Sequence, residues 1–168
     1  MAFEKIHPKD LKENVFSLVQ DKWLLVTAGT KEHCNPMTAS WGSFGVFWRE
    51  YVSTVYLRPQ RYTCKVLDET EYYSICVFGE EYREALNYCG KASGADEDKG
   101  KGCGLTILEA ECGAPYFEEA ELVFICKKLY HQPMVPENIL APEVEVHYAN
   151  KDYHRMFWGG IIEVLKKV

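Results

Sequence analysis

The fold class of this chain is decided by residues 35–63, whose sequence is NPMTASWGSFGVFWREYVSTVYLRPQRYT. Two segments inside this stretch, 37–47 and 52–57, are rich in Thr, Val, Trp and Phe, which are residues that strands favour. The polar pair Arg49 and Glu50 separates them as a turn. We therefore predict two consecutive strands here.

Four further segments are apolar and rich in β-branched or aromatic residues, and we predict strands for all of them: 23–28, 72–78, 122–130 and 156–165. Residues 80–89 have helical periodicity instead, with apolar side chains three or four residues apart and Gly90 as the expected stop. Shorter helical turns are expected within 9–18 and 61–69. Many strands, few helices and no alternation of the two predict a mainly β fold, an antiparallel barrel.

The length of the chain predicts its domain organisation. A chain of 168 residues can bury one substantial core, so we predict a single domain over residues 1–168. The polar, glycine-rich segment 91–104 is too long for a tight turn, and we expect a functional or mobile loop. A second irregular stretch, 133–150, carries three prolines between two predicted strands.

Composition and charge argue against several classes of function. The formal net charge is −6 and Lys and Arg form no cluster, so we do not expect nucleic-acid binding. No run approaches the roughly 20 apolar residues of a membrane span, and the start of the chain has no leader pattern. Seven cysteines with no C-x-x-C pair are expected to be free thiols rather than metal ligands. We therefore expect a cytoplasmic protein without a metal site.

Common nucleotide-binding and hydrolytic motifs are absent from the sequence. Gly100, Gly102 and Gly104 have neither the G-x-G-x-x-G spacing nor the preceding strand that a Rossmann turn requires. No Walker loop, H-E-x-x-H or G-x-S-x-G pattern occurs. Any nucleotide must therefore be bound by another kind of site.

The first candidate site lies in NPMTASWGSFG, residues 35–45. Thr38 and Ser40 are small and polar, so they leave the backbone accessible, and Trp41 offers a flat π surface. A planar ligand can lie along such a strand with its polar edge against backbone N–H groups. From these residues alone, a well-packed strand with a core tryptophan is the alternative.

The second candidate site is LRPQRYT, residues 57–63. Arg58 and Arg61 flank Pro59, and Thr63 follows two residues later, so two guanidinium groups and a hydroxyl can converge at the end of a strand. These groups are suited to binding a phosphate. The alternative is a solvated turn whose arginines pair with surface acids.

Taken in order, these patterns resemble a known family. N-P-M-T-A-S-W-G at 35–42, R-P-x-R-x-T at 58–63, a helix, and then G-x-x-S-G and D-K between Gly90 and Lys99 are similar to the flavin-reductase-like FMN-binding split barrels, flavoredoxins in particular. The terminal DYHRMFWGGI is similar to the family's last strand with its H-x-x-x-x-G signature. The resemblance implies a split β-barrel that forms a homodimer, with FMN near the subunit interface.

The resemblance also implies roles for individual residues. One group would lie along or contact the isoalloxazine ring, and a second group would hold the phosphate. The first group is Asn35, Thr38, Ala39, Ser40 and Trp41, and the second is Arg58, Arg61, Thr63 and Lys99. Without the resemblance, Lys99 would be predicted to be a solvated loop lysine.

Two further residues are assigned by the resemblance near the flavin. His131 in LYHQP matches a family histidine, with a strand-end histidine that binds no ligand as the alternative. Trp158 matches an aromatic residue that packs over the ring. His154 is expected to be structural, and Gly160 stands where many relatives have an acidic residue.

The function implied is that of an FMN-dependent oxidoreductase or electron carrier. Electrons would come from NADH, NADPH or a redox partner protein, and the hydride chemistry would belong to the flavin. One alternative is an FMN-binding module that stores or shuttles flavin without turnover. Another is a different ligand on the same barrel, such as haem or a pyridoxal-type cofactor.

Overall fold

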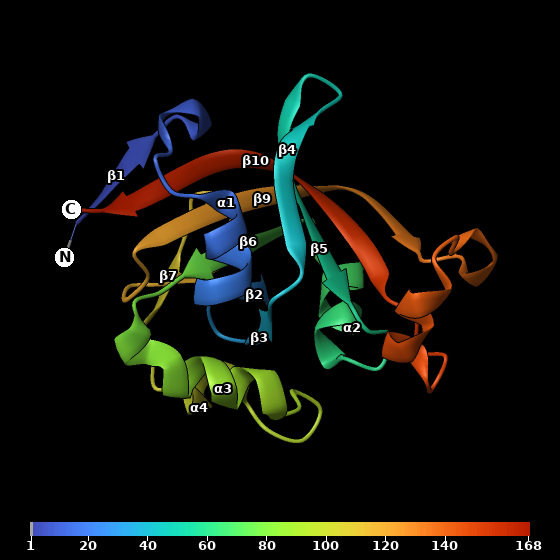
Figure 1. Cartoon of the computed structure of the whole chain (residues 1–168). Coiled ribbons are helices and arrows are strands. Elements are labelled where there is room, and N and C mark those ends of the chain that lie inside the picture. Colours follow the sequence, from blue (N-terminus) through green and yellow to red (C-terminus); the bar gives the residue numbers. More distant parts are fainter. Residues whose placement is uncertain (1) are drawn as a thin grey trace.

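The fold is built on one antiparallel sheet, described for residues 2–168 by a computed structural model (Figure 1). Its strands follow the order β3-β2-β6-β9-β10-β5-β4, and β1 adds to β10. Their bounds are β1 Phe3–Ile6, β2 Leu24–Gly29, β3 Cys34–Ala39, β4 Gly42–Phe47, β5 Glu50–Leu57, β6 Tyr72–Val77, β9 Leu122–Pro133 and β10 Arg155–Lys167. A separate two-stranded sheet consists of β7 Ile107–Glu109 and β8 Pro115–Phe117.

The connection between β3 and β4 closes the sheet into a split barrel. These two strands lie at opposite ends of the strand order, yet only Ser40 and Trp41 separate them along the chain. A Cβ added to Gly42 would lie 3.0 Å from the Thr54 carbonyl on β5 and 3.3 Å from Leu24 on β2. The two ends of the sheet therefore meet at this glycine without pairing to each other.

The prediction of one continuous strand over 37–47 was wrong, because the sheet closes within this segment. The chain leaves the edge of β2 after Ala39 and joins the edge of β5 at Gly42, so the strand is interrupted at Ser40 and Trp41. The six predicted strand regions are otherwise confirmed, with β9 and β10 extending beyond the predicted limits. The short strands β1, β7 and β8 were not predicted because they are only three or four residues long.

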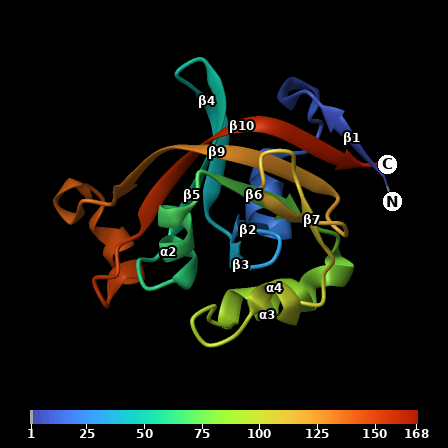
Figure 2. The same cartoon turned by 180° about the vertical axis from the view of Figure 1, so that it is seen from behind.

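The α-helices are few and short. They are α1 Val15–Ser17, α2 Tyr62–Glu69, α3 Arg83–Lys91 and α4 Lys99–Gly102. The expected helix over 80–89 is confirmed, although its first turn, Glu80–Tyr82, is a 3-10 turn and the helix passes Gly90. In Figures 1 and 2, α3 and α4 lie together beside β3, below the barrel.

Both faces of the central strands are buried. Val26 on β2 faces the barrel interior with Ile75, Phe124 and Phe157, whereas Leu25 faces outward into a second apolar cluster. That second cluster packs under α3 and the β7–β8 pair. Because side chains on both faces of β2 are buried, its sequence is a continuous apolar run rather than an alternation of apolar and polar residues.

Gly159 on β10 gives a test of this packing. A Cβ at this position would lie 2.2 Å from the Tyr73 hydroxyl and 2.8 Å from the Cys126 Cβ. We predict that Gly159→Ala lowers the free energy of unfolding by about 1–3 kcal/mol, measured by urea denaturation. Gly45→Ala is the control, because nothing lies within 4 Å of its added Cβ, and a change within about 0.5 kcal/mol is expected. Equal stability of the two variants would contradict the packing described.

Candidate functional site

The start of α2 presents N–H groups that no side chain caps. β5 ends at Leu57, a turn closes with the Arg61 N–H donating to the Arg58 carbonyl at 3.0 Å, and α2 begins at Tyr62. The side chain of the N-cap residue, Arg61, makes no capping hydrogen bond. The first turn of α2 therefore offers N–H groups, at the positive end of the helix dipole, to an anion.

Two cationic side chains converge on the end of α3 close to this helix start. Arg61 donates from Nη1 to the Gly90 carbonyl at 2.8 Å, and Lys99 donates from Nζ to the Cys89 carbonyl at 2.8 Å. Lys99 is only 2% exposed, so the expectation from the residues alone of a solvated lysine was wrong. The carbonyl end of α3 carries partial negative charge, which favours cations there.

These two cations lack a carboxylate partner within residues 2–168. Burial and the neighbouring Arg61 lower the pKa of Lys99 to about 8, and burial also lowers the pKa of Arg61. A lowered pKa means that the charged form is disfavoured in the absence of a counter-charge. The site therefore has a net positive charge that an anion would stabilise.

A cavity of about 110 Å³ lies between the start of α2 and the loop after α3, and Arg61, Thr63, Ser93 and Lys99 line it. The Asn35 amide donates to the Thr63 hydroxyl at 2.7 Å, and both side chains are buried. Because the Thr63 oxygen is the acceptor in that bond, its own proton remains available to an oxyanion. The cavity thus combines two cations, a hydroxyl donor and a helix start.

Gly94 allows the loop to close over this cavity. A Cβ at Gly94 would lie 1.9 Å from the Asn35 side-chain oxygen and 2.7 Å from the Tyr62 ring. No side chain other than hydrogen therefore fits at this position while Asn35 and Tyr62 keep their places. The glycine of the G-x-x-S-G pattern is required by this close approach.

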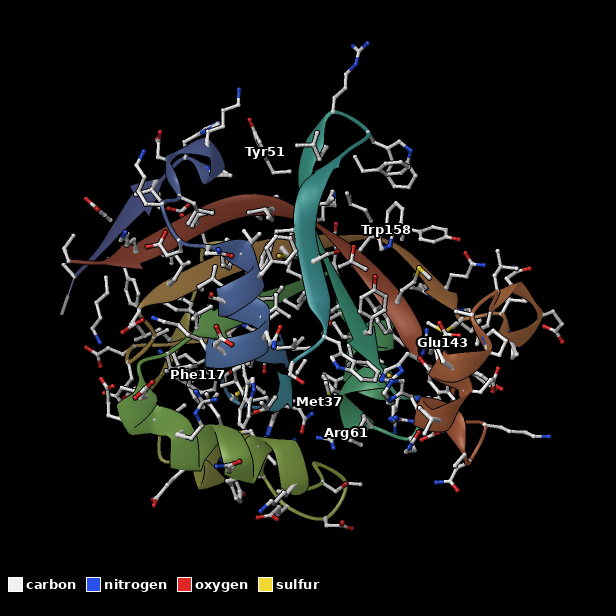
Figure 3. All side chains as sticks on the ribbon, in the orientation of Figure 1. Met37, Tyr51, Arg61, Phe117, Glu143 and Trp158 are labelled. Atoms are coloured by element: carbon white, nitrogen blue, oxygen red, sulfur yellow. The ribbon has the colours of Figure 1, made fainter. Side chains whose placement is uncertain are left out.

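A groove of about 220 Å³ extends from Arg61 along the end of β3, and it is lined by Met37, Thr38, Ala39, Ser40, Trp41, Tyr56, Arg58, Arg61 and His154. β3 pairs only with β2, so its other edge carries backbone groups that no strand pairs. Such an edge can hydrogen-bond a planar polar ligand. In Figure 3, Met37 and Arg61 lie near each other at this lower edge of the barrel.

Beyond Trp41 the groove opens into a larger cavity of about 780 Å³, with Phe16, Trp23 and Phe44 among its lining residues. Trp41 is 42% exposed, so the alternative of a core tryptophan does not fit the structure. Its ring centroid lies 5.0 Å from that of His154. The groove therefore has one aromatic wall that remains accessible to a ligand.

His154 forms the floor between the groove and the larger cavity. Its Nδ1 atom lies 3.0 Å from the Tyr148 hydroxyl, and burial lowers its pKa to about 4. The ring is therefore neutral at neutral pH. His154 was expected to be structural, and it lines both cavities. Tyr56 was not predicted as a site residue, although the alternation of side chains along β5 places Tyr56 on the face that lines the groove.

The structure brings most of the predicted site residues together. Asn35, Thr38, Ala39, Ser40, Trp41, Arg58, Arg61, Thr63 and Lys99 surround the groove and the cavity at its end. Thr38 donates to the Leu86 carbonyl at 2.6 Å, and Arg58 pairs with Asp152 at 2.6 Å. Arg58 thus follows the surface ion-pair alternative, whereas Arg61 does not.

His131 and Trp158 lie apart from the groove, and their roles stay predictions. His131 is on β9, with its Nδ1 atom 3.2 Å from the Arg155 guanidinium. Trp158 is on β10, in an aromatic cluster with Phe47, Trp48 and Tyr130. Figure 3 shows that Trp158 lies toward the β4–β5 hairpin. Within one chain, neither side chain lines the cavities described above.

The chain belongs to the flavin reductase-like domain family, because the family model described as "Flavin reductase like domain" matches residues 17–162. Among curated proteins, no sequence matches this chain significantly. The antiparallel sheet with few helices matches the FMN-binding split barrels. Across the described residues, no helix is long and apolar enough to cross a membrane.

Solved structures share this fold at low sequence identity. Flavoredoxin from Methanosarcina acetivorans is 22% identical, with a TM-score of 0.71 over 98% of this chain and 76% of that one. An FMN-binding protein from Thermus thermophilus with bound p-hydroxybenzaldehyde is 17% identical, with a TM-score of 0.71 over 98% and 82%. The NADH:FAD oxidoreductase SgcE6 of Streptomyces globisporus is 15% identical, with a TM-score of 0.66 over 87% and 75%.

The lowered pKa of Lys99 predicts a pH dependence of stability. Between its folded pKa of about 8 and the ordinary value of 10.5, the unfolded chain binds more protons than the folded one. The contribution of Lys99 to the free energy of unfolding therefore rises as pH increases through that window. We predict that wild type gains unfolding free energy relative to Lys99→Met between pH 7.5 and 9.5, measured by urea denaturation. Lys101→Met, at an exposed lysine, should show no such trend, and a pH-independent difference for Lys99→Met would refute the assignment.

Proposed function

We propose that this protein binds FMN and acts as an FMN-dependent oxidoreductase or electron carrier. Its electrons would come from NADH, NADPH or a redox partner protein. The observation that carries the proposal is the pair of cations formed by the half-buried Arg61 and the buried Lys99, which have no carboxylate partner within residues 2–168 and lie beside the uncapped start of α2. A phosphate group supplies the charge and the acceptor oxygens that this arrangement lacks.

The groove between this cavity and Trp41 suits the rest of the cofactor. It begins at Arg61, follows the unpaired edge of β3 and ends at an exposed aromatic ring. FMN, when bound, supplies a ring system that accepts a hydride and passes electrons singly or in pairs. The chain's own residues bind and orient it: the backbone of β3 can meet its polar edge, and the Trp41 ring can contact its face.

The neutral His154 ring has a positioning role in this proposal. Its hydrogen bond to Tyr148 and its contact with Trp41 fix the orientation of the groove wall. A neutral imidazole adds no charge beside a bound flavin ring. The side chains of Tyr56 and Met37 also line this groove.

The names of similar proteins support both parts of the proposal. The Thermus protein is described as FMN-binding, which fits the anion cavity and groove found here. SgcE6 is described as an NADH:FAD oxidoreductase, which supports a nicotinamide donor as one source of electrons. The predicted cytoplasmic location stays a prediction, and the seven free thiols are consistent with it.

A homodimer belongs to the same proposal, with FMN near the interface. The β4–β5 hairpin projects from the barrel, and it exposes Val46, Phe47 and Trp48 (Figure 1). Trp48 and Arg49 form its two-residue turn with φ values of 52° and 64°, the positive φ at both central residues that favoured two-residue hairpin turns have. A second copy of this chain would cover these apolar side chains at the tip of the hairpin.

Arg61→Ala tests the phosphate assignment. We predict that this change weakens FMN binding by about 1.5 to 3 kcal/mol, the range for a hydrogen bond to a charged group, and leaves riboflavin binding nearly unchanged. Riboflavin is the matched ligand because it lacks the phosphate. Both affinities are measured by flavin fluorescence quenching. Lys101→Ala removes the same charge from an exposed position and should affect neither ligand, whereas equal losses of FMN and riboflavin affinity for Arg61→Ala would refute the assignment.

Steady-state turnover separates an enzyme from a flavin-storing module. Purified protein with FMN, an electron acceptor and either NADH or NADPH is expected to oxidise the nicotinamide faster than FMN alone. The protein's visible spectrum, recorded in the same experiment, identifies a haem or pyridoxal-type ligand if one is present. Tight FMN binding with negligible nicotinamide oxidation would favour the module or a partner protein as the electron donor.

Trp48→Glu tests the dimer. A charge at the hairpin tip should raise the dimer dissociation constant by about tenfold or more if this aromatic side chain is buried between two copies, as measured by sedimentation equilibrium. Leu140→Glu is the control, because Leu140 is equally apolar and 92% exposed but lies in the 133–150 stretch. A wild-type protein that is monomeric at all concentrations would contradict the proposed assembly.

A further inference from the structure

The larger cavity beyond Trp41 adjoins the groove and has no ligand assigned to it. Ser40, Trp41, Tyr56 and His154 line both spaces, so the cavity and the groove are continuous. The volume of about 780 Å³ lies within the range of pockets that bind small organic molecules. Because the groups of FMN are assigned to the groove and the anion cavity, a second molecule can occupy this larger space.

The wall of the larger cavity is aromatic and carries no formal charge. Within residues 2–168, none of the side chains that line it belongs to Asp, Glu, Lys or Arg. Burial lowers the pKa of His154, so its ring is neutral at neutral pH as well. A charged group placed here would lose water without gaining an ion partner, which costs free energy. The aromatic lining residues are Phe16, Trp23, Trp41, Phe44, Tyr56 and Tyr148.

Trp23 is held on this wall by an unusual backbone conformation. It follows the π-helical turn Leu18–Lys22, and its φ of 68° and ψ of 160° lie in a region that is almost exclusive to glycine. The Arg83 guanidinium carbon lies 4.2 Å from the centre of the Trp23 ring, and Arg83 also donates to the Asp21 carbonyl at 2.8 Å. Strained backbone of this kind is concentrated at ligand sites. The fold therefore fixes one aromatic ring on the cavity wall at a cost in backbone strain.

Hydroxyl groups supply hydrogen-bond donors on the same wall. Tyr56 is half-buried, and its hydroxyl has no hydrogen-bond partner within residues 2–168. The Ser40 and Ser43 hydroxyls, which belong to the same wall, have no partner in this part of the chain either. A hydroxyl in this state can donate to a carbonyl oxygen of a ligand. The wall thus suits a molecule that is planar, uncharged and equipped with an acceptor oxygen.

We propose that the larger cavity binds a planar, uncharged aromatic compound with a carbonyl group, packed against Trp23 and hydrogen-bonded by Tyr56. Such a compound leaves the groove free, so it and a flavin can occupy one protein molecule together. Its use as the second substrate of the oxidoreductase rests on the proposed function, whereas its binding does not. A whole nicotinamide dinucleotide does not suit this cavity, because its phosphates meet no cation among the described residues of the wall.

The preference for an uncharged ligand is tested with two naphthalene derivatives of similar shape. 2-Acetonaphthone carries a ketone, and 2-naphthoate carries a carboxylate. Binding of each to the purified full chain is measured by ligand-observed NMR titration, with and without saturating FMN. The ketone is expected to bind about tenfold or more tightly than naphthoate, because the carboxylate would be desolvated without a partner. FMN should not displace the ketone. Equal affinities would overturn the proposal, and so would competition with FMN, which would assign the cavity to the flavin itself.

Two substitutions test the wall residues. Trp23→Gly removes the ring and introduces a residue that adopts the local backbone freely, and it should weaken ketone binding about fivefold. Tyr56→Phe should weaken ketone binding about fivefold and leave binding of naphthalene, which has no carbonyl, unchanged. Tyr51→Phe is the control, because it removes the same hydroxyl from the same strand at a position that does not line the cavity. Undiminished ketone binding by both cavity variants would overturn the proposal.

Failure of this inference is distinguishable from failure of the proposed function. A protein that binds the ketone as predicted but leaves FMN fluorescence unchanged would count against the proposed function alone. A protein that binds FMN but shows no ketone binding up to the solubility limit of the ketone would overturn this inference and leave FMN binding intact.

Discussion

The carbonyl groups at the end of α3 hold two cations that the rest of the site depends on. Arg61 reaches them from the start of α2, and Lys99 reaches them from the first residue of α4. The starts of α2 and α4 and the end of α3 thus meet at one point, and its positive charge has no carboxylate partner within residues 2–168. The lowered pKa values of both groups show that the arrangement is costly without an anion. A phosphate-bearing ligand is the simplest counterpart to this charge.

The barrel places this point at the end of a groove. Because the sheet closes at Gly42 with β3 and β4 unpaired, one edge of β3 is left free. The turn after β5 positions Arg61 at the end of that edge, and Trp41 lies at its other end. Family membership and the site geometry therefore agree, since the flavin reductase-like model covers the strands and the turn that build the groove.

Much of the fold was predictable from sequence, because strands with apolar or β-branched runs, such as 72–78 and 122–130, are confirmed. The break at Ser40 was not predictable, because it results from closure of the sheet rather than from local propensity. The cluster around Arg61 followed from motif order and the family resemblance. The burial of Lys99 did not follow from local composition, since a polar, glycine-rich loop gives no indication of the carbonyl that binds its ammonium group.

The central claim is the binding of FMN. The most direct test is the spectrum and fluorescence of FMN titrated with the purified protein, followed by addition of NADH. The account predicts quenched flavin fluorescence and a bound flavin band, which bleaches with NADH if the nicotinamide is the donor. FMN fluorescence that excess protein leaves unchanged would contradict the account.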